Sequence, residues 1–283
     1  MRYAPWPILA ALLVLAPACD SGASDAGTDD GGETEEGLVW SDEFNYTGAP
    51  DASKWDYDIG AGGWGNNESQ FYTNNSDNVR VDGEHLIIEA HRESLGGAEY
   101  TSARLVSRGK AAFRYGRFEV RAMIPAGIGT WPAIWMLPEN NAYGGWPNSG
   151  EIDIMEHVGK DQNRVHASLH MGELNHLKGT QTSGSLPVSD ATTAFHVYAV
   201  EWGPEDMRFF IDDRLVPIST NAFSGTGAYR NPEQGPGYWP FDQDFHFLFN
   251  IAVGGNWGGP DIDPSAFPAR MLIDYVRVYE WSE

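Results

Sequence analysis

Cysteine and basic residues are both scarce in this chain. Cys19 is the only cysteine among 283 residues, which excludes a disulfide within one chain, so the fold must be stabilised by its core. Lysine and arginine together number 18 against 40 acidic residues, which gives a net charge of −22. Such a charge repels phosphates, so we expect no nucleic-acid partner, and it also disfavours an anionic polysaccharide relative to a neutral one.

Sustained helical periodicity is also missing after residue 37. Short alternating runs separated by turn residues take its place, and glycine (33 residues) and proline (17 residues) supply many turns. We therefore predict one all-β domain, a β-sandwich over residues 38–283, large enough for a substantial core. The predicted strands lie within HLIIEAHRE (85–93), GRFEVRAMIP (116–125), VHASLHM (165–171), HVYAVEWGP (196–204), MRFFIDDRLV (207–216), FHFLFNIAV (245–253) and MLIDYVRVYEW (271–281).

The first 37 residues have a different composition from the rest. Residues 1–18 carry one basic residue, then an apolar run and small residues, a pattern typical of a signal peptide and too short for a membrane span. Cys19 would become the new N-terminus, and the segment resembles a bacterial lipoprotein signal. Residues 19–37 are acidic and rich in glycine and serine, which predicts a flexible tether. We expect an exported, extracellular or membrane-anchored protein that is a monomer.

The segment GEIDIMEHVG at 150–159 places three carboxylates in an otherwise apolar strand. Side chains alternate along a strand, so Glu151 and Asp153 share one face, whereas Glu156 would point to the other. A β-bulge with Met155 as the extra residue would restore Glu156 to the face of the other two acids, and bulges often lie beside active sites. The pattern therefore predicts three acids on one wall of a groove.

Carboxylates crowded in this way cannot all ionise at low cost. One keeps its proton near neutral pH while another stays charged, which supplies a general acid and a nucleophile, as in glycoside hydrolysis. We expect Asp153 to lie between the two glutamates and to hydrogen-bond Glu151. The spacing does not say which glutamate has which role.

Several segments together resemble glycoside hydrolase family 16, most closely its laminarinase-type endo-β-1,3-glucanases. The resemblance covers the chain from about Leu38 onward and rests on GEIDIMEHVG together with WGNNESQFYT (64–73), GTWPAIWMLP (129–138) and FNIAVGGNWGG (249–259). It implies a concanavalin A-like jelly-roll sandwich with a substrate cleft on its concave face. It also implies retaining hydrolysis without a cofactor, with Glu151 as the nucleophile and Glu156 as the acid/base.

Aromatic and amide side chains form a second set of candidate site residues. Indole rings bind the apolar faces of sugars, and polar neighbours bind the hydroxyls. Trp131 and Trp135 can share one strand face, whereas Trp146 and Trp239 are loop residues assigned to no role. The resemblance extends the substrate-binding candidates to Trp64, Asn66, Asn67, Arg104, Trp131, Trp135, His170, Asn256 and Trp257.

A structural cation is the one metal that the resemblance implies. Members of the family often bind calcium on the convex face, and the matching oxygen ligands here are the carboxylates of Glu43 and Asp274 and the carbonyl of Gly83. Hard oxygen ligands suit calcium.

Three functions remain in competition after the sequence has been read. The first is a retaining endo-hydrolase of laminarin-like β-1,3-glucan or mixed-linkage β-glucan. The second keeps the fold and mechanism but acts on another polysaccharide, such as an agar-type galactan, because loop residues set the substrate. The third is a noncatalytic glucan-binding module, which the survival of Glu151, Asp153 and Glu156 disfavours.

Overall fold

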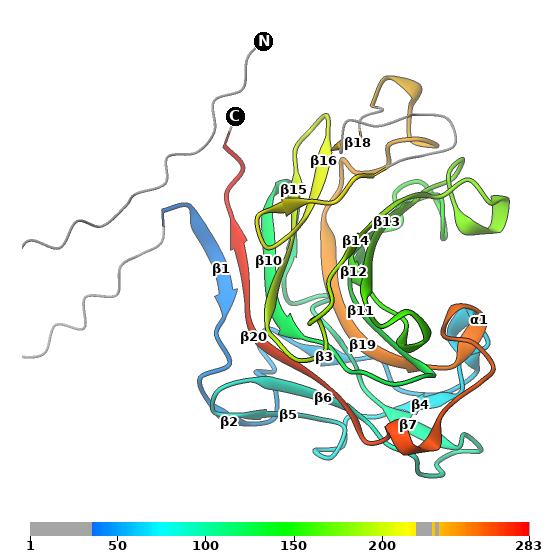
Figure 1. Cartoon of the computed structure of the whole chain (residues 1–283). Helices are drawn as coiled ribbons and strands as arrows, with labels where there is room; N and C mark the ends of the chain where they lie inside the picture. The colour runs from blue at the N-terminus through cyan, green and yellow to red at the C-terminus, as the bar shows by residue number, and fades with distance from the viewer. Residues whose placement is uncertain (1–35, 219–227, 230–231, 283) are drawn as a thin grey trace, which may run out of the picture. The chain divides into compact units, whose positions relative to one another are not determined.

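Two antiparallel β-sheets packed face to face form most of the part of the chain that the structure, a computed structural model, describes (Figure 1). This part comprises residues 36–218, 228–229 and 232–282. The predicted signal peptide and nearly all of the predicted tether, residues 1–35, lie outside it. Within the described ranges, no helix has the length and apolar character needed to cross a membrane.

The outer sheet contains ten strands of the described residues in the order β17-β16-β15-β10-β20-β6-β5-β2, with β1 paired to β20 and β18 to β16. Its strands are β1 (Leu38–Asp42), β2 (Thr47–Gly48), β5 (Val79–Asp82), β6 (Leu86–Ala90), β10 (Gly116–Met123), β15 (His196–Trp202), β16 (Met207–Ile211), β17 (Arg214–Leu215), β18 (Ala228–Tyr229) and β20 (Ala269–Tyr279).

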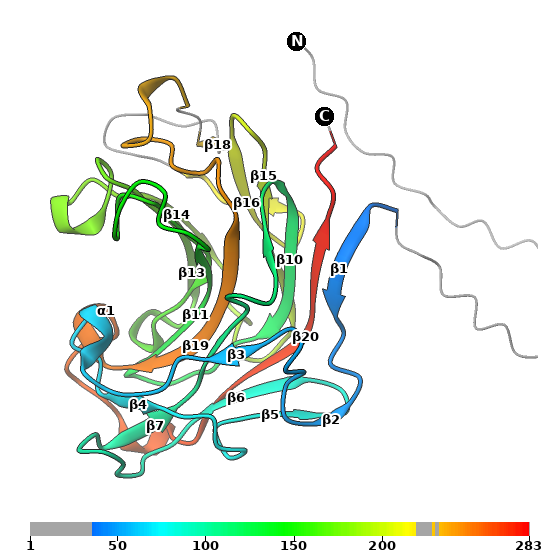
Figure 2. The ribbon, with the colours of Figure 1, turned by 180° about the vertical axis from the view of Figure 1, so that it is seen from behind.

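The second sheet curves strongly, as both ribbon views show, and we call it the concave sheet (Figures 1 and 2). Its eight described strands run in the order β14-β13-β12-β11-β19-β8-β3, with β9 paired to β19. The strands are β3 (Asp56–Tyr57), β8 (Arg104–Val106), β9 (Ala112–Phe113), β11 (Thr130–Pro138), β12 (Glu151–Glu156), β13 (Arg164–His170), β14 (Thr182–Pro187) and β19 (Phe245–Val253).

The remaining elements are short. A parallel pair joins β4 (Gln70–Tyr72) to β7 (Tyr100–Ser102). Single turns of helix are η1 (Gly63–Gly65), η2 (Gly159–Asp161), η3 (His176–Lys178), η4 (Pro232–Gln234), α1 (Gly255–Gly258) and η5 (Pro264–Ala266). The seven predicted strand segments all contain strands of the two sheets, so the all-β sandwich with jelly-roll architecture is confirmed.

Alternation along the strands separates the core from the outer faces. In β19, Phe245, Phe247 and Phe249 are fully buried between the sheets, while Asn250 turns to the concave face. In β10, Phe118 and Val120 enter the same core. Burial of a large side chain contributes roughly 1.5–3 kcal/mol relative to exposure, so these repeats, rather than disulfides, stabilise the sandwich.

The bulge predicted in β12 is confirmed, with a shift of one residue. Opposite β11, Met155 pairs with Ile134 and Asp153 pairs with Trp135, so the skipped residue is Ile154 and not Met155. Opposite β13, Ile154 and Met155 together span the single residue between Ser168 and His166. Both bulge residues are buried in the core, because the extra residue lets two successive side chains enter it.

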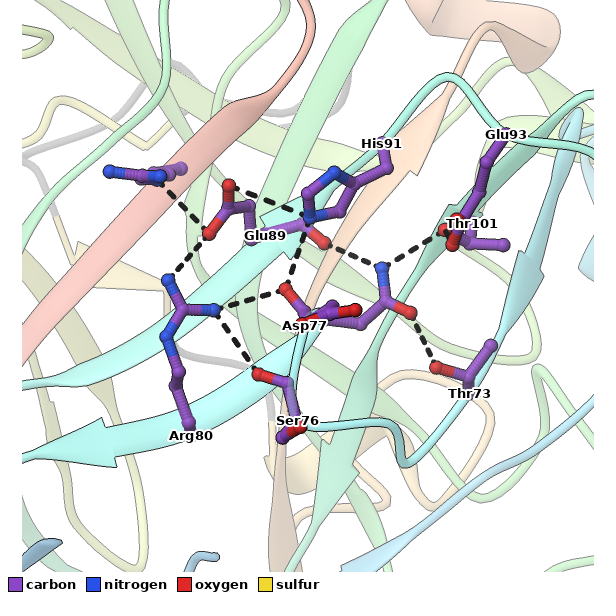
Figure 3. A network of polar contacts seen from close by, with 10 residues as sticks. Thr73, Ser76, Asp77, Arg80, Glu89, His91, Glu93 and Thr101 are labelled. Atoms are coloured by element: carbon purple, nitrogen blue, oxygen red, sulfur yellow. Dashed lines mark hydrogen bonds and ion pairs between the residues drawn. The ribbon is translucent and has the colours of Figure 1, made fainter. Parts of the chain in front are cut away.

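A buried acid also lies in the outer sheet. Glu89 of β6 is 2% exposed and accepts from Arg80 at 2.7 Å, and Arg270 of β20 pairs with the same carboxylate at 3.0 Å. His91 lies 3.5 Å from its other oxygen, and Figure 3 shows how the surrounding side chains converge. Cations therefore compensate the negative charge on this face of the sheet.

Candidate active site

A groove of about 350 Å³ crosses the concave sheet. Strand alternation brings to it the side chains that point away from the core of β11, β12 and β19, and loops supply its rims. Among the described residues it is lined by Trp64, Gly65, Asn66, Glu68, Arg104, Trp131, Ala133, Trp135, Leu137, Trp146, Glu151, Asp153, Glu156, His176, Leu177, Asn250 and Ala252. The mixture of aromatic rings with a few convergent polar groups is typical of a carbohydrate site.

The bulge in β12 brings Glu151, Asp153 and Glu156 to this groove together. Asp153 is 3% exposed and hydrogen-bonds Glu151. His170 of β13 lies opposite Glu151 of β12. Its Nε2 atom lies 3.4 Å from Asp153 Oδ2 and 3.9 Å from Glu151 Oε1. One carboxylate oxygen each of Glu151 and Asp153 and one ring nitrogen of His170 lie within 4.8 Å of one another. The charge on each of these groups therefore affects the other two.

Burial shifts the pKa values of all three acids upward. Loss of solvent raises the pKa of Glu151 to about 7 and, with repulsion from Glu151, that of Glu156 to about 8. The pKa of Asp153 is well above its ordinary value because the carboxyl group is buried and repelled by both glutamates. Burial and the nearby His176 lower the pKa of His170 to about 4, so this imidazole is neutral at pH 7 and offers no compensating charge.

Each glutamate has its own indole donor. The Nε1–H of Trp146 donates to Glu151 Oε2 at 2.7 Å, and the Nε1–H of Trp131 donates to Glu156 Oε1 at 3.1 Å. A hydrogen bond to the ionised form lowers a pKa, so each tryptophan partly offsets the effect of burial on its carboxylate. The two donors hold the two acids in fixed orientations.

Arg104 is the principal cation of the groove. Its guanidinium lies 4.9 Å from the ring of Trp64 and 4.7 Å from the ring of Trp135, and it pairs with Asp58 at 3.1 Å. Trp64 has a left-handed φ of 47°, which a glycine-rich loop around η1 accommodates and which is uncommon for a bulky residue. The strained loop holds one indole where it covers the arginine.

A hydrogen-bond chain fixes the floor beside Arg104. Trp135 Nε1 donates to Asn250 at 2.8 Å, Asn250 Nδ2 donates to Tyr72 at 3.0 Å, and the Tyr72 hydroxyl donates to Glu68 at 3.2 Å. Gln70 Nε2 also donates to Glu68, at 2.6 Å. Burial raises the pKa of Glu68 despite these bonds, so the groove contains a fourth perturbed acid.

The structure brings together most, but not all, of the predicted substrate-binding residues. Trp64, Asn66, Arg104, Trp131 and Trp135 line the groove. The other four lie outside the lining set, and each contacts a residue of that set or another of the predicted ones. Asn256 accepts from Asn67 at 2.8 Å and donates its backbone N–H to Asn66, Trp257 packs edge-on against Trp131, and His170 contacts the acids.

The predicted calcium ligands have other partners in this structure. Glu43 forms a two-pronged ion pair with Arg277, with a closest approach of 2.9 Å, and Asp274 pairs with Arg121. The carboxylates of Glu43 and Asp274 can coordinate a cation only if their ion pairs with Arg277 and Arg121 break.

Sequence reasoning gave no role to several groove residues, among them Trp146, His176, Leu177 and Asn250, and it left Glu68 open between a cleft-lining and an exposed position. Asn250 carried a usable signal, because it is the one side-chain amide in a strand that is apolar except for His246. Glu68 stood beside two candidate asparagines but showed no sign of the Tyr72 and Gln70 side chains that converge on it. The loop residues Trp146, His176 and Leu177 reach the groove only through tertiary structure.

A sandwich with buried, hydrogen-bonded carboxylic acids on the floor of an aromatic groove defines a glycoside hydrolase. The chain belongs to glycosyl hydrolases family 16, whose sequence model matches residues 66–240. It is 57% identical over 250 residues to a beta-glucanase of Rhodothermus marinus, covering 87% of this chain and 86% of that protein. A glucan endo-1,3-beta-glucosidase of Cryptopygus antarcticus is 38% identical, over 87% and 92% of the two chains. The crystal structure of the Rhodothermus marinus laminarinase superposes with a TM-score of 0.81 at 57% identity, covering 87% of this chain and 98% of that one.

Proposed function

We propose that the protein is a retaining endo-hydrolase of β-1,3-glucan, acting on laminarin-like or mixed-linkage chains. The observation that carries the proposal is the pairing of Glu151 and Glu156 on one face of β12, each with a raised pKa and its own indole donor. The similarity to a beta-glucanase and to a glucan endo-1,3-beta-glucosidase supports the choice of glucan.

The family resemblance assigns the roles of the two glutamates, and the order of their pKa values agrees with that assignment. Glu151 has the lower pKa of the two glutamates, so it is the more readily ionised and attacks the anomeric carbon. Glu156 has the higher pKa, holds its proton and gives it to the leaving glycosidic oxygen. Asp153 keeps a proton shared with Glu151. Glu156 then takes a proton from water, which releases the sugar from Glu151 with its configuration retained. The reaction needs no cofactor.

Proton NMR of laminarin during the first minutes of hydrolysis tests the proposal. We expect new reducing ends to appear as the β-anomer before mutarotation. An early α-anomer would contradict the double displacement, and cleavage of an agar-type galactan in place of laminarin would contradict the substrate. Binding of laminarin without any cleavage would identify a glucan-binding module instead.

We also propose that the protein is exported and anchored through a lipid on Cys19, with residues 20–37 as a tether. The apolar leader and the cysteine that follows Ala18 support this. Mass spectrometry of the N-terminal peptide from the native host distinguishes a diacylated Cys19 from an unmodified or differently cleaved terminus. Size-exclusion chromatography with light scattering tests the expected monomer.

A structural calcium on the convex side remains a proposal. Glu43, Asp274 and the Gly83 carbonyl supply oxygen ligands of the kind calcium prefers, although Arg277 and Arg121 compete for the carboxylates. Chelation with EGTA should lower the melting temperature of the wild type and leave that of a Glu43→Gln variant unchanged. An EGTA-insensitive wild type would remove the site.

A further inference from the structure

Leu177 is the most exposed large apolar side chain of the described residues, at 73%, yet it lines the same groove as Glu151. It lies in η3, on the loop that follows β13. Figures 1 and 2 show this loop, in yellow-green, across the concavity from α1. A single exposed leucine needs no explanation by itself. This one lies in the lining of the active-site groove, where a bound ligand would meet it.

The loop is rigidly built, so the exposure of Leu177 is not a result of poor packing. Asn175 is 1% exposed, and its side-chain amide donates to the carbonyls of Met171 and Gly172 at 3.0 and 3.2 Å while its oxygen accepts from the Lys178 backbone. Lys178 Nζ donates to the Gly172 carbonyl at 2.7 Å. Four hydrogen bonds, one of them buried, therefore fix the loop in the conformation that exposes Leu177.

The rim is joined to the catalytic centre through aromatic contacts. The ring of His176 lies 5.1 Å from the ring of Trp146 and 5.1 Å from that of His170. Trp146 in turn donates to Glu151. Leu177 therefore belongs to a wall that contacts Glu151 through Trp146.

The position of this wall along the groove identifies the sugar that it meets. Strands β11, β19 and β8 carry Trp135, Asn250 and Arg104 on one side of β12, and β13 and β14 lie on the other side. The family resemblance assigns Arg104 to the nonreducing part of a bound glucan, so a chain that crosses the strands from there extends its leaving-group part over β13. The loop after β13 stands over that part of the chain.

Resting on the proposed retaining glucanase function, we infer that Leu177 is a specificity-determining residue that packs against the sugar on the leaving-group side and favours sugar over water as the acceptor. In the transfer step the bond between Glu151 and the anomeric carbon breaks, a hydroxyl oxygen of the acceptor sugar bonds to that carbon, and the hydroxyl proton passes to Glu156. Water competes for the same step and has no apolar face for Leu177 to bind.

The test compares transfer with hydrolysis in one reaction. Laminarin serves as the donor, ¹³C-labelled laminaribiose as the acceptor, and mass spectrometry counts labelled transfer products against new unlabelled reducing ends. Leu177→Ser should lower the transfer-to-hydrolysis ratio roughly fivefold, the effect of losing about 1 kcal/mol of apolar contact. Leu177→Met, which keeps the apolar contact, should restore most of the ratio.

Leu95→Ser is the matched control, because Leu95 is 40% exposed and outside the groove lining. It should leave the ratio at the wild-type value. An unchanged ratio in Leu177→Ser, or equal loss of transfer and hydrolysis with an unchanged melting temperature, would overturn the role of Leu177. Failure of the wild type to cleave laminarin would instead overturn the proposed function and, with it, the inference.

Discussion

Two buried acids, one in each sheet, have opposite electrostatic environments. Glu89 in the outer sheet is 2% exposed and Asp153 in the concave sheet is 3% exposed. Burial alone would raise both pKa values, but hydrogen bonds and ion pairs with Arg80 and Arg270 outweigh it at Glu89, whose pKa is lowered (Figure 3). Asp153 lies beside neutral His170 and is repelled by two more carboxyl groups, so its pKa is raised.

The difference shows how the fold separates stability from function. The outer sheet neutralises its acids with arginines, as at Glu43, Glu89 and Asp274. In the groove, no arginine or lysine among the described residues forms an ion pair with Glu151, Asp153 or Glu156, and the more distant Arg104 lowers the pKa of Glu151 only in part. These acids therefore hold protons at a pH where exposed carboxyl groups have lost them. Unpaired buried acids cost stability, and they supply the general acid that hydrolysis requires.

The largest expected effect is on catalysis. Glu151→Gln and Glu156→Gln should each lower kcat on laminarin by about a thousandfold or more, because an amide neither attacks carbon nor gives up a proton on demand. Glu89→Gln, the same change in the other sheet, should leave kcat per folded molecule within about twofold. Near-normal turnover in either groove variant would refute the assignment of the two glutamates.

Substitutions of the two buried acids Glu89 and Asp153 should change stability in opposite directions. Glu89→Gln leaves two arginines facing a neutral group, so we expect unfolding free energy to fall by about 2 kcal/mol, after discounting the partial exposure of both arginines. Asp153→Asn removes a carboxyl that resists ionisation, so we expect the unfolding free energy to rise at pH 7. Urea denaturation at pH 7 measures both values, and changes of the same sign would break the comparison.

The pH dependence of stability provides a further test. Because Glu151 and Glu156 have folded-state pKa values above those of exposed glutamate, the folded protein binds more protons, and their contribution to stability is lost as the pH rises from about 4.5 to about 8. Glu89 acts in the opposite direction. Because its pKa is lowered, its contribution to stability is lost as the pH falls below the ordinary pKa of glutamate. The double variant Glu151→Gln, Glu156→Gln should therefore gain stability over wild type between pH 5 and pH 8, and identical pH curves for the two proteins would exclude raised pKa values.

The smallest expected effects concern the two indole donors. Trp146→Phe removes the bond that holds down the pKa of Glu151, so the acidic limb of kcat/KM should move to higher pH by about half a unit. Trp131→Phe removes the corresponding bond to Glu156 and should move the basic limb to higher pH. If both variants shifted the same limb, the separate pairing of each indole with one acid would be wrong.

The sequence predicted the parts of this molecule that depend on local periodicity. The seven strand segments and the bulge follow from alternation, because Glu156 can join Glu151 and Asp153 only if one residue is skipped. The bulge position was one residue off, since the pairing partners of Ile154 and Met155 in β11 are not visible in β12 itself.

Contacts between distant segments were beyond such reasoning. The chain from Trp135 through Asn250 and Tyr72 to Glu68 joins three strands and a loop, and no single stretch of sequence contains it. The arginine partners of Glu43 and Asp274 likewise come from other positions of the outer sheet. The exposure of Leu177 depends on a loop fold that Asn175 fixes.

The most direct test is a ¹³C NMR titration of the side-chain carboxyl groups, assigned with Gln and Asn variants. Glu151 should titrate near pH 7, Glu156 near pH 8 and Asp153 well above its ordinary value, while Glu89 titrates below the ordinary range for glutamate. Ordinary pKa values for the three groove acids, or a raised pKa for Glu89, would contradict the conclusion that the two sheets shift the pKa values of their buried acids in opposite directions.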